Sequence, residues 1–71
     1  MKLPRDLSGG EVVRGLKRLG FVVVRQVGSH IRLVRGEARV TVPAHGAIAP
    51  GTLKSILRQA GVSLEELLAA L

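Results

Sequence analysis

Hydrophobic residues recur along this chain with two different periods, one typical of helices and one typical of strands. Helical spacing follows Ser8 and again follows Pro50, and short runs of alternating apolar and polar residues lie between them. We therefore expect the order helix, three strands, helix and a short final helix. The simplest packing is an α+β fold, in which a three-stranded antiparallel sheet carries both long helices on one face.

The helices are predicted by their ends as well as by their apolar positions. Residues that favour helix ends stand at the expected boundaries: capping boxes of Ser8 with Glu11 and Ser63 with Glu66, Pro50 in a first turn, and Gly20 and Gly61 after last turns. The short final helix is expected over residues 64–70. The residues expected to face the core are Val12, Val13, Leu16, Leu19, Leu53, Ile56, Leu57 and Ala60.

The strands are predicted by β-branched runs and by glycine-containing turns. Residues 21–24 form a short strand, and residues 25–28 lead out of it into a turn. A type II′ hairpin loop at Gly36 and Glu37 would set the next register, pairing Ile31 with Val42, Leu33 with Val40, Arg32 with Thr41 and His30 with Pro43. The apolar pairs then face the helices. The opposite face of the sheet, here called the open face, would carry His30, Arg32, Arg39 and Thr41.

Basic residues are concentrated in the first half of the chain. Eleven Lys and Arg against five Asp and Glu give a net charge of +6, and residues 1–39 hold nine of these bases and three of the acids. A concentrated positive field attracts polyanions, nucleic acid first among them. Arg14, Lys17 and Arg18 share the outer side of the first helix, where we expect phosphate contacts. Phe21 is the sole aromatic residue, so contacts to phosphate and sugar are expected rather than an aromatic stacking platform.

The remaining composition narrows the class of protein. A chain of 71 residues is expected to form one small domain over residues 1–71. The absence of cysteine excludes a disulfide framework and a cysteine-based zinc site. Two histidines without carboxylates at ligand spacing predict no metal site, and we expect no cofactor. Residues 1–10 lack the apolar core of a signal peptide and no apolar run spans a membrane, so we expect a cytoplasmic protein without a membrane partner.

His30 is the main candidate for chemistry. Gly28 and Ser29 form the turn before it and leave room for close approach of a ligand. Arg25, through the turn, and Arg32, on the same face, are candidates for binding phosphate. An imidazole can act as general base or general acid near neutral pH. The alternative is that His30 is an ordinary surface side chain.

His45 is the only other histidine, and it is a second candidate for contact with a polyanion. It lies two residues past Pro43, the expected cross-strand neighbour of His30. The two imidazoles are therefore expected close together, as in a base–acid pair. An exposed loop histidine without a role is the competing interpretation.

An ordered set of short motifs resembles the HicA toxin family: Gly20-Phe21, Gly28-Ser29-His30, Val40-Thr41-Val42-Pro43 with His45, and Gly51-Thr52-Leu53 through Ile56-Leu57 to Ala60-Gly61. The resemblance covers roughly residues 1–68. It implies a double-stranded-RNA-binding-domain-like α-β-β-β-α fold. It also implies a toxin that is a metal-independent mRNA endoribonuclease, an mRNA interferase, held inactive by a HicB-type antitoxin.

The resemblance also implies roles for individual residues. The catalytic histidine of the family corresponds to His30, and Gly28 and Ser29 correspond to the turn that presents it. His45 stands at a common position of the family without an assigned role. The loop over residues 44–49 is rich in alanine and glycine, where relatives are usually more polar.

Three other interpretations are compatible with the sequence. One is a non-catalytic RNA-binding module of the same fold. Another is a DNA-binding helix-turn-helix over residues 53–71, although its recognition helix would carry two acids and no base. Finally, the last helix could dock its leucines on the domain's own core, on an antitoxin or on another copy, and the oligomeric state is left open: these are Leu64, Leu67, Leu68 and Leu71.

Overall fold

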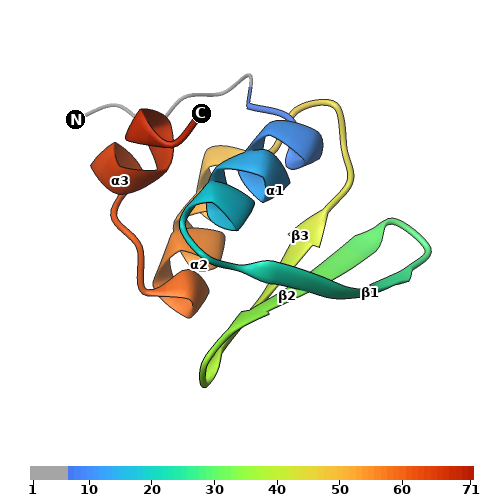
Figure 1. The fold of residues 1–71 in the computed structure, drawn as a ribbon. Coiled ribbons are helices and arrows are strands. Elements are labelled where there is room, and N and C mark those ends of the chain that lie inside the picture. Colours follow the sequence, from blue (N-terminus) through green and yellow to red (C-terminus); the bar gives the residue numbers. More distant parts are fainter. Residues whose placement is uncertain (1–6) are drawn as a thin grey trace.

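A computed structural model describes residues 7–71 of the chain (Figure 1). Residues 1–6 lie outside the described part, and with them Lys2, Arg5 and most of the segment expected to lack a signal peptide. The elements follow the predicted order: α1 (Gly9–Arg18), β1 (Val22–Val27), β2 (His30–Arg35), β3 (Ala38–Pro43), α2 (Pro50–Ala60) and α3 (Leu64–Ala69).

Local capping groups set the helix ends as predicted. Ser8 and Glu11 form a complete capping box at α1, and Ser63 and Glu66 form another at α3. The chain leaves α2 through Gly61, whose φ of +67° is a left-handed conformation that glycine adopts without steric cost. These ends depend on neighbours in the sequence, which is why the pattern of residues was sufficient to place them.

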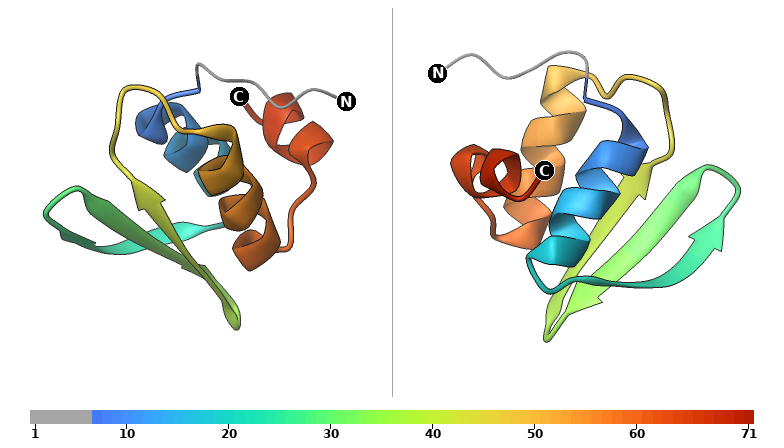
Figure 2. Two further views of the ribbon diagram at one scale, coloured as in Figure 1. Left: turned by 180° about the vertical axis from the view of Figure 1, so that it is seen from behind. Right: turned by 45° about the horizontal axis from the view of Figure 1, so that its top comes forward.

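The sheet is antiparallel in the order β1-β2-β3. The register between β2 and β3 is the predicted one, with His30 opposite Pro43, Arg32 opposite Thr41 and Leu33 opposite Val40. Gly36 has a φ of +58°, as the first central residue of a type II′ turn requires. Figure 2 shows α1 and α2 side by side on one face of this sheet.

Strand β1 differs from its prediction in length and regularity. It continues to Val27, because Val27 pairs with His30 of β2, and a bulge at Val24 shifts the register between Val23 and Arg25. All six of its residues are exposed, since β1 is an edge strand and its hairpin with β2 projects beyond the helices (Figure 2). Of the predicted strand over residues 21–24, Phe21 is buried in the core, whereas the three valines after it contribute surface.

The core lies between the covered face of the sheet and the helices. The predicted core residues Val12, Leu16, Leu33 and Leu53 are fully buried or nearly so. Ile48 is also buried at 2% exposure, and its N–H donates to the Leu7 carbonyl at 2.8 Å, so the loop before α2 is anchored in a way the sequence pattern did not indicate.

Helix α3 packs on the domain's own core. Leu67 is fully buried, whereas Leu68 is 40% exposed. Gly15 of α1 lies so close to Leu67 that a Cβ built there would be 2.7 Å from its Cδ1 atom. Leu67 therefore docks on the domain's own core and Leu64 and Leu71 pack against it in part, whereas Leu68 stays at the surface.

The resulting α-β-β-β-α-α order around an open three-stranded sheet is the double-stranded-RNA-binding-domain-like α+β fold. Among the helices of residues 7–71, none combines the length and the apolar character needed to cross a lipid bilayer.

Candidate functional site

The strand register decides which side chains share the open face of the sheet. Residues directly opposite one another on antiparallel strands point to the same side. Three rows therefore cross the open face from β1 to β3: Val27, His30 and Pro43; then Arg25, Arg32 and Thr41; then Val22, Val34 and Arg39. His30 and the two arginines named from the sequence thus lie in adjacent rows.

His30 is the first residue of β2 and is exposed. The turn before it begins at Gly28, whose φ of +58° would strain any other residue. The carbonyl of Ser29 accepts a 2.6 Å hydrogen bond from the N–H of Ala44. This bond holds the loop after β3 beside the turn that presents His30.

The same loop is tied to the start of α1. The carbonyl of His45 accepts a 2.8 Å hydrogen bond from the N–H of Gly9, one of the donors that a helix start leaves free. A Cβ at Gly9 would collide with the carbonyl oxygen of Pro43. Glycine is therefore required where α1 meets the loop, and the backbone of His45 is fixed while its side chain is exposed.

Arg25 and Arg32 are direct cross-strand partners. Like charges in this arrangement repel one another and destabilise a sheet. Within residues 7–71 neither guanidinium donates a hydrogen bond to another group. Arg35, by contrast, donates to the Leu19 carbonyl at 2.8 Å and stacks 4.7 Å from the ring centre of Phe21. The open face thus carries two adjacent guanidinium groups that stabilise no other part of the described structure. Such a pair is suited to binding an anion.

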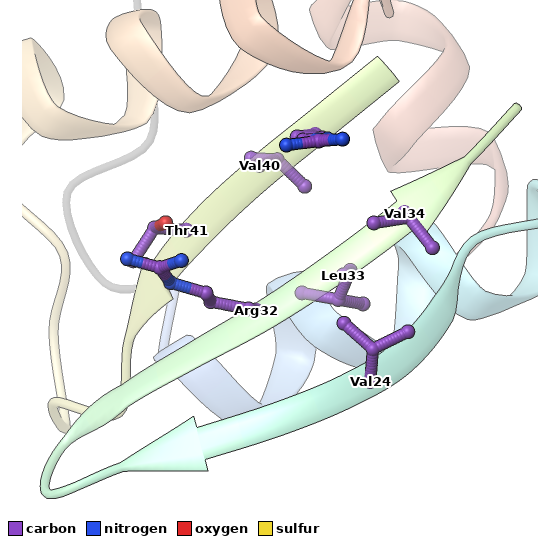
Figure 3. A pocket seen from close by; sticks show the side chains of 7 residues that line it. Val24, Arg32, Leu33, Val34, Val40 and Thr41 are labelled. Carbon is purple, nitrogen blue, oxygen red and sulfur yellow. The ribbon is translucent and has the colours of Figure 1, made fainter. Parts of the chain in front are cut away.

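A hollow adjoins these arginines on the open face (Figure 3). It has a volume of about 270 Å³ and is lined by Val24, Arg32, Leu33, Val34, Arg39, Val40 and Thr41. In Figure 3, Val24 of β1 lies beside Leu33 of β2, with Val34 further along the same strand, while Arg32 reaches across towards Thr41 of β3.

The sequence alone did not predict that these lining residues form a hollow. Alternation placed Arg32, Arg39 and Thr41 on this face, so part of the signal was available. The contribution of Val24 depends on the bulge in β1, which the residue pattern did not reveal.

The basic stripe of α1 lies on a different side of the molecule from His30. Arg14, Lys17 and Arg18 are exposed on the outer side of α1, and α1 itself packs on the covered face of the sheet (Figure 2). With Gly10 and Val13 they line a separate hollow of about 400 Å³. Arg18 also donates to the Ala70 carbonyl at 3.2 Å, where a cation suits the end of α3. A role of this stripe in binding RNA stays a prediction.

The two carboxyl groups with shifted pKa values in the described chain both serve helix caps. Hydrogen bonds from the backbone and hydroxyl of Ser8 lower the pKa of Glu11, and those of Ser63 lower the pKa of Glu66. Residues 7–71 contain no group of three or more His, Asp, Glu or Cys side chains placed to hold a metal ion.

Fold and site together define a small α+β protein of the double-stranded-RNA-binding-domain-like class. Its open sheet face carries an exposed histidine and arginines that have no partner within residues 7–71. The family model described as HicA toxin of bacterial toxin–antitoxin matches residues 9–62. Since the match covers more than half of the chain, the protein belongs to the HicA toxin family, whose members act in toxin–antitoxin pairs. A search of curated proteins finds no match to the chain.

Proposed function

We propose that this HicA-family toxin is an mRNA endoribonuclease that works without a metal ion and uses His30 to transfer the proton. The observation that carries the proposal is the exposed position of His30 at the start of β2, one row from Arg25 and Arg32. Family membership supports the toxin role, and the sheet geometry supports the chemistry.

The proposed reaction is attack by the RNA on its own backbone. His30, as general base, removes the proton of a ribose 2′-hydroxyl, and the 2′-oxygen forms a bond to the adjacent phosphorus. The bond from phosphorus to the 5′-oxygen breaks, giving a 2′,3′-cyclic phosphate and, after protonation, a 5′-hydroxyl. Arg25 and Arg32 stabilise the charge that develops on the phosphate oxygens.

His45 is the proposed donor of the second proton. The Ala44–Ser29 hydrogen bond keeps its loop beside the His30 turn. Gly28 and Ser29 contribute the exposed turn along which the RNA backbone approaches. The stripe of Arg14, Lys17 and Arg18 would bind a more distant part of the same mRNA.

The proposed partner besides mRNA is a HicB-type antitoxin. An inhibitor that covers the open face should be acidic where it meets Arg25, Arg32 and Arg39, because opposite charges steer association and suppress wrong partners. Toxicity would then return when the antitoxin is removed.

The test is cleavage of RNA by the purified protein in the presence of EDTA, followed by mapping of both new ends. We expect cleavage with cyclic phosphate and 5′-hydroxyl ends, and we expect His30→Ala to lower the rate by about 10²- to 10⁴-fold, the usual contribution of a general acid or base. Circular dichroism should show an unchanged fold, because the His30 side chain is exposed.

His45→Ala provides the comparison, and a smaller loss is expected for it. Loss of cleavage with EDTA would refute the metal-free mechanism. Full cleavage by His30→Ala would refute the role of this histidine. RNA binding without cleavage by the unaltered protein would favour the non-catalytic RNA-binding module.

A further inference from the structure

The hollow on the open face has a composition unlike that of a simple phosphate site. Its walls combine the apolar side chains of Val24 and Val34 with the guanidinium groups of Arg32 and Arg39 and the hydroxyl-bearing Thr41. Binding a phosphate would use only the guanidinium groups and would leave the apolar part of the lining without a role. Apolar groups beside planar cations are suited to a flat ring whose faces are apolar and whose edges are polar.

We infer that this hollow is a subsite for one unstacked nucleobase of the RNA, next to the phosphate held at His30; the inference rests on the proposed function. Guanidinium planes stack on bases as aromatic rings do, so the scarcity of aromatic residues does not prevent base binding here. The hollow is a local depression of about 270 Å³, which suits a single ring system better than a duplex.

The spacing of rows on the open face supports this placement. Side chains on one face of a strand repeat every second residue, about 6.7 Å apart. This is close to the separation of successive phosphates in an extended RNA strand. RNA that follows β2 from His30 past Arg32 to Val34 would place a phosphate at the first two residues and the neighbouring base at the hollow.

The polar groups of the hollow also indicate which base edge fits. A guanidinium only donates hydrogen bonds. Arg39 therefore matches a base whose free edge accepts twice, and guanine, with N7 and O6, is the best match. Specificity would come from the hollow, whereas the phosphate contacts of Arg25 would be independent of sequence.

An RNA backbone without bases makes it possible to measure the contribution of the base to binding. We would compare the binding of a guanine-rich oligoribonucleotide with that of a fully abasic ribose-phosphate strand of equal length, using the His30→Ala protein so that neither is cut. Because a stacked base adds to the affinity, the base-bearing strand should bind about fivefold or more tightly. Equal binding of the two strands would overturn the subsite.

Matched variants locate the preference in the hollow. Arg39→Gln should remove most of it, whereas Arg58→Gln, the same change of charge on α2, should retain it. Val24→Thr should reduce the preference, whereas Val22→Thr, on the same exposed strand but outside the lining, should not. Equal effects within either pair would also overturn the assignment.

Cleavage mapping separates this inference from the proposed function. The unaltered protein should cut at a fixed position relative to guanine, and Arg39→Gln should cut with less selectivity. Cleavage without any base preference would refute the subsite and leave the nuclease intact. If no RNA is cut, the proposed nuclease fails, and the comparison with the abasic strand still decides whether the hollow binds a base.

Discussion

Arg25 and Arg32 lie directly opposite each other on neighbouring strands, although repulsion between like charges opposes folding. Exposed strand positions accept many polar residues, and threonine is among the best suited to them. Two arginines at one cross-strand position therefore indicate a use for the charge, such as binding a phosphate.

Replacing Arg32 with threonine should separate stability from binding. Arg32→Thr removes the repulsion and places threonine opposite Thr41, so the free energy of unfolding should rise by ~0.2–1 kcal/mol. RNA affinity should fall in the same protein. Urea unfolding and RNA titration measure the two effects, with Arg58→Gln as the control. A less stable protein with unchanged affinity would contradict the phosphate role of Arg32.

The positions of several individual residues could be predicted from the sequence. The position of His30 on the open face and its pairing with Pro43 followed from alternation and one hairpin turn. The pairing of Arg25 with Arg32 did not follow, because it depends on the bulge at Val24, which is set by contacts between β1 and β2 and not by the order of residues in β1.

At the scale of elements, two glycines in helices have opposite surroundings. Gly15 of α1 faces Leu67 and Leu71 of the α3 segment, with 2.7 Å and 3.2 Å from a built Cβ to their nearest methyl groups. Gly51 in the first turn of α2 has no atom within 4 Å of its built Cβ. Gly15 therefore allows α1 and α3 to pack closely against each other, whereas Gly51 lies in open space and allows no such contact.

Alanine at these two positions should therefore change stability in opposite directions. Gly51→Ala should stabilise the protein by about 0.4–1 kcal/mol, because alanine restricts the unfolded chain. Gly15→Ala should destabilise it by about 1–3 kcal/mol, because Leu67 is fully buried and overpacking outweighs the gain in helix propensity. Thermal unfolding of both variants tests the pair. A stabilised Gly15→Ala protein would show that α3 is loosely packed.

The elements differ in how far the sequence predicted them. Helix ends were predicted because capping boxes, proline and glycine act within a few residues. The end of β1 was missed because residues 25–27 carry no strong strand signal and become a strand only through pairing with β2. The burial of Ile48 was likewise decided by a distant segment at Leu7.

At the scale of the whole molecule, the layered arrangement divides the basic residues between two surfaces. The sheet presents Arg25, Arg32 and Arg39 on its open face, whereas α1, which packs on the covered face (Figure 2), carries the exposed Arg14 and Lys17. The basic residues of the described part of the chain therefore do not form one continuous site. An RNA long enough to reach both surfaces would have to pass around the edge of the domain.

Acid should weaken the whole fold through its helix caps. Hydrogen bonds at the caps hold the pKa values of Glu11 and Glu66 below the ordinary 4.5. The unfolded chain then binds protons more readily than the folded one, so this stability is present above pH 4.5 and is lost as the pH falls further.

Urea unfolding across this pH range would measure the loss. The double variant Glu11→Gln with Glu66→Gln should show a smaller decrease on acidification, because glutamine keeps the capping geometry without titrating. An equally steep decrease in the variant would show that other carboxyl groups are responsible.

By itself, the sequence determined the order of elements, the caps, the register of β2 with β3 and the open-face position of His30, because each follows from periodicity or from contacts among near neighbours. Tertiary structure alone decided the bulge at Val24, the pairing of Arg25 with Arg32, the hollow beside them and the separation of the α1 stripe from the sheet. These features arise where segments far apart in the chain pack together, and the local pattern of residues does not specify such contacts.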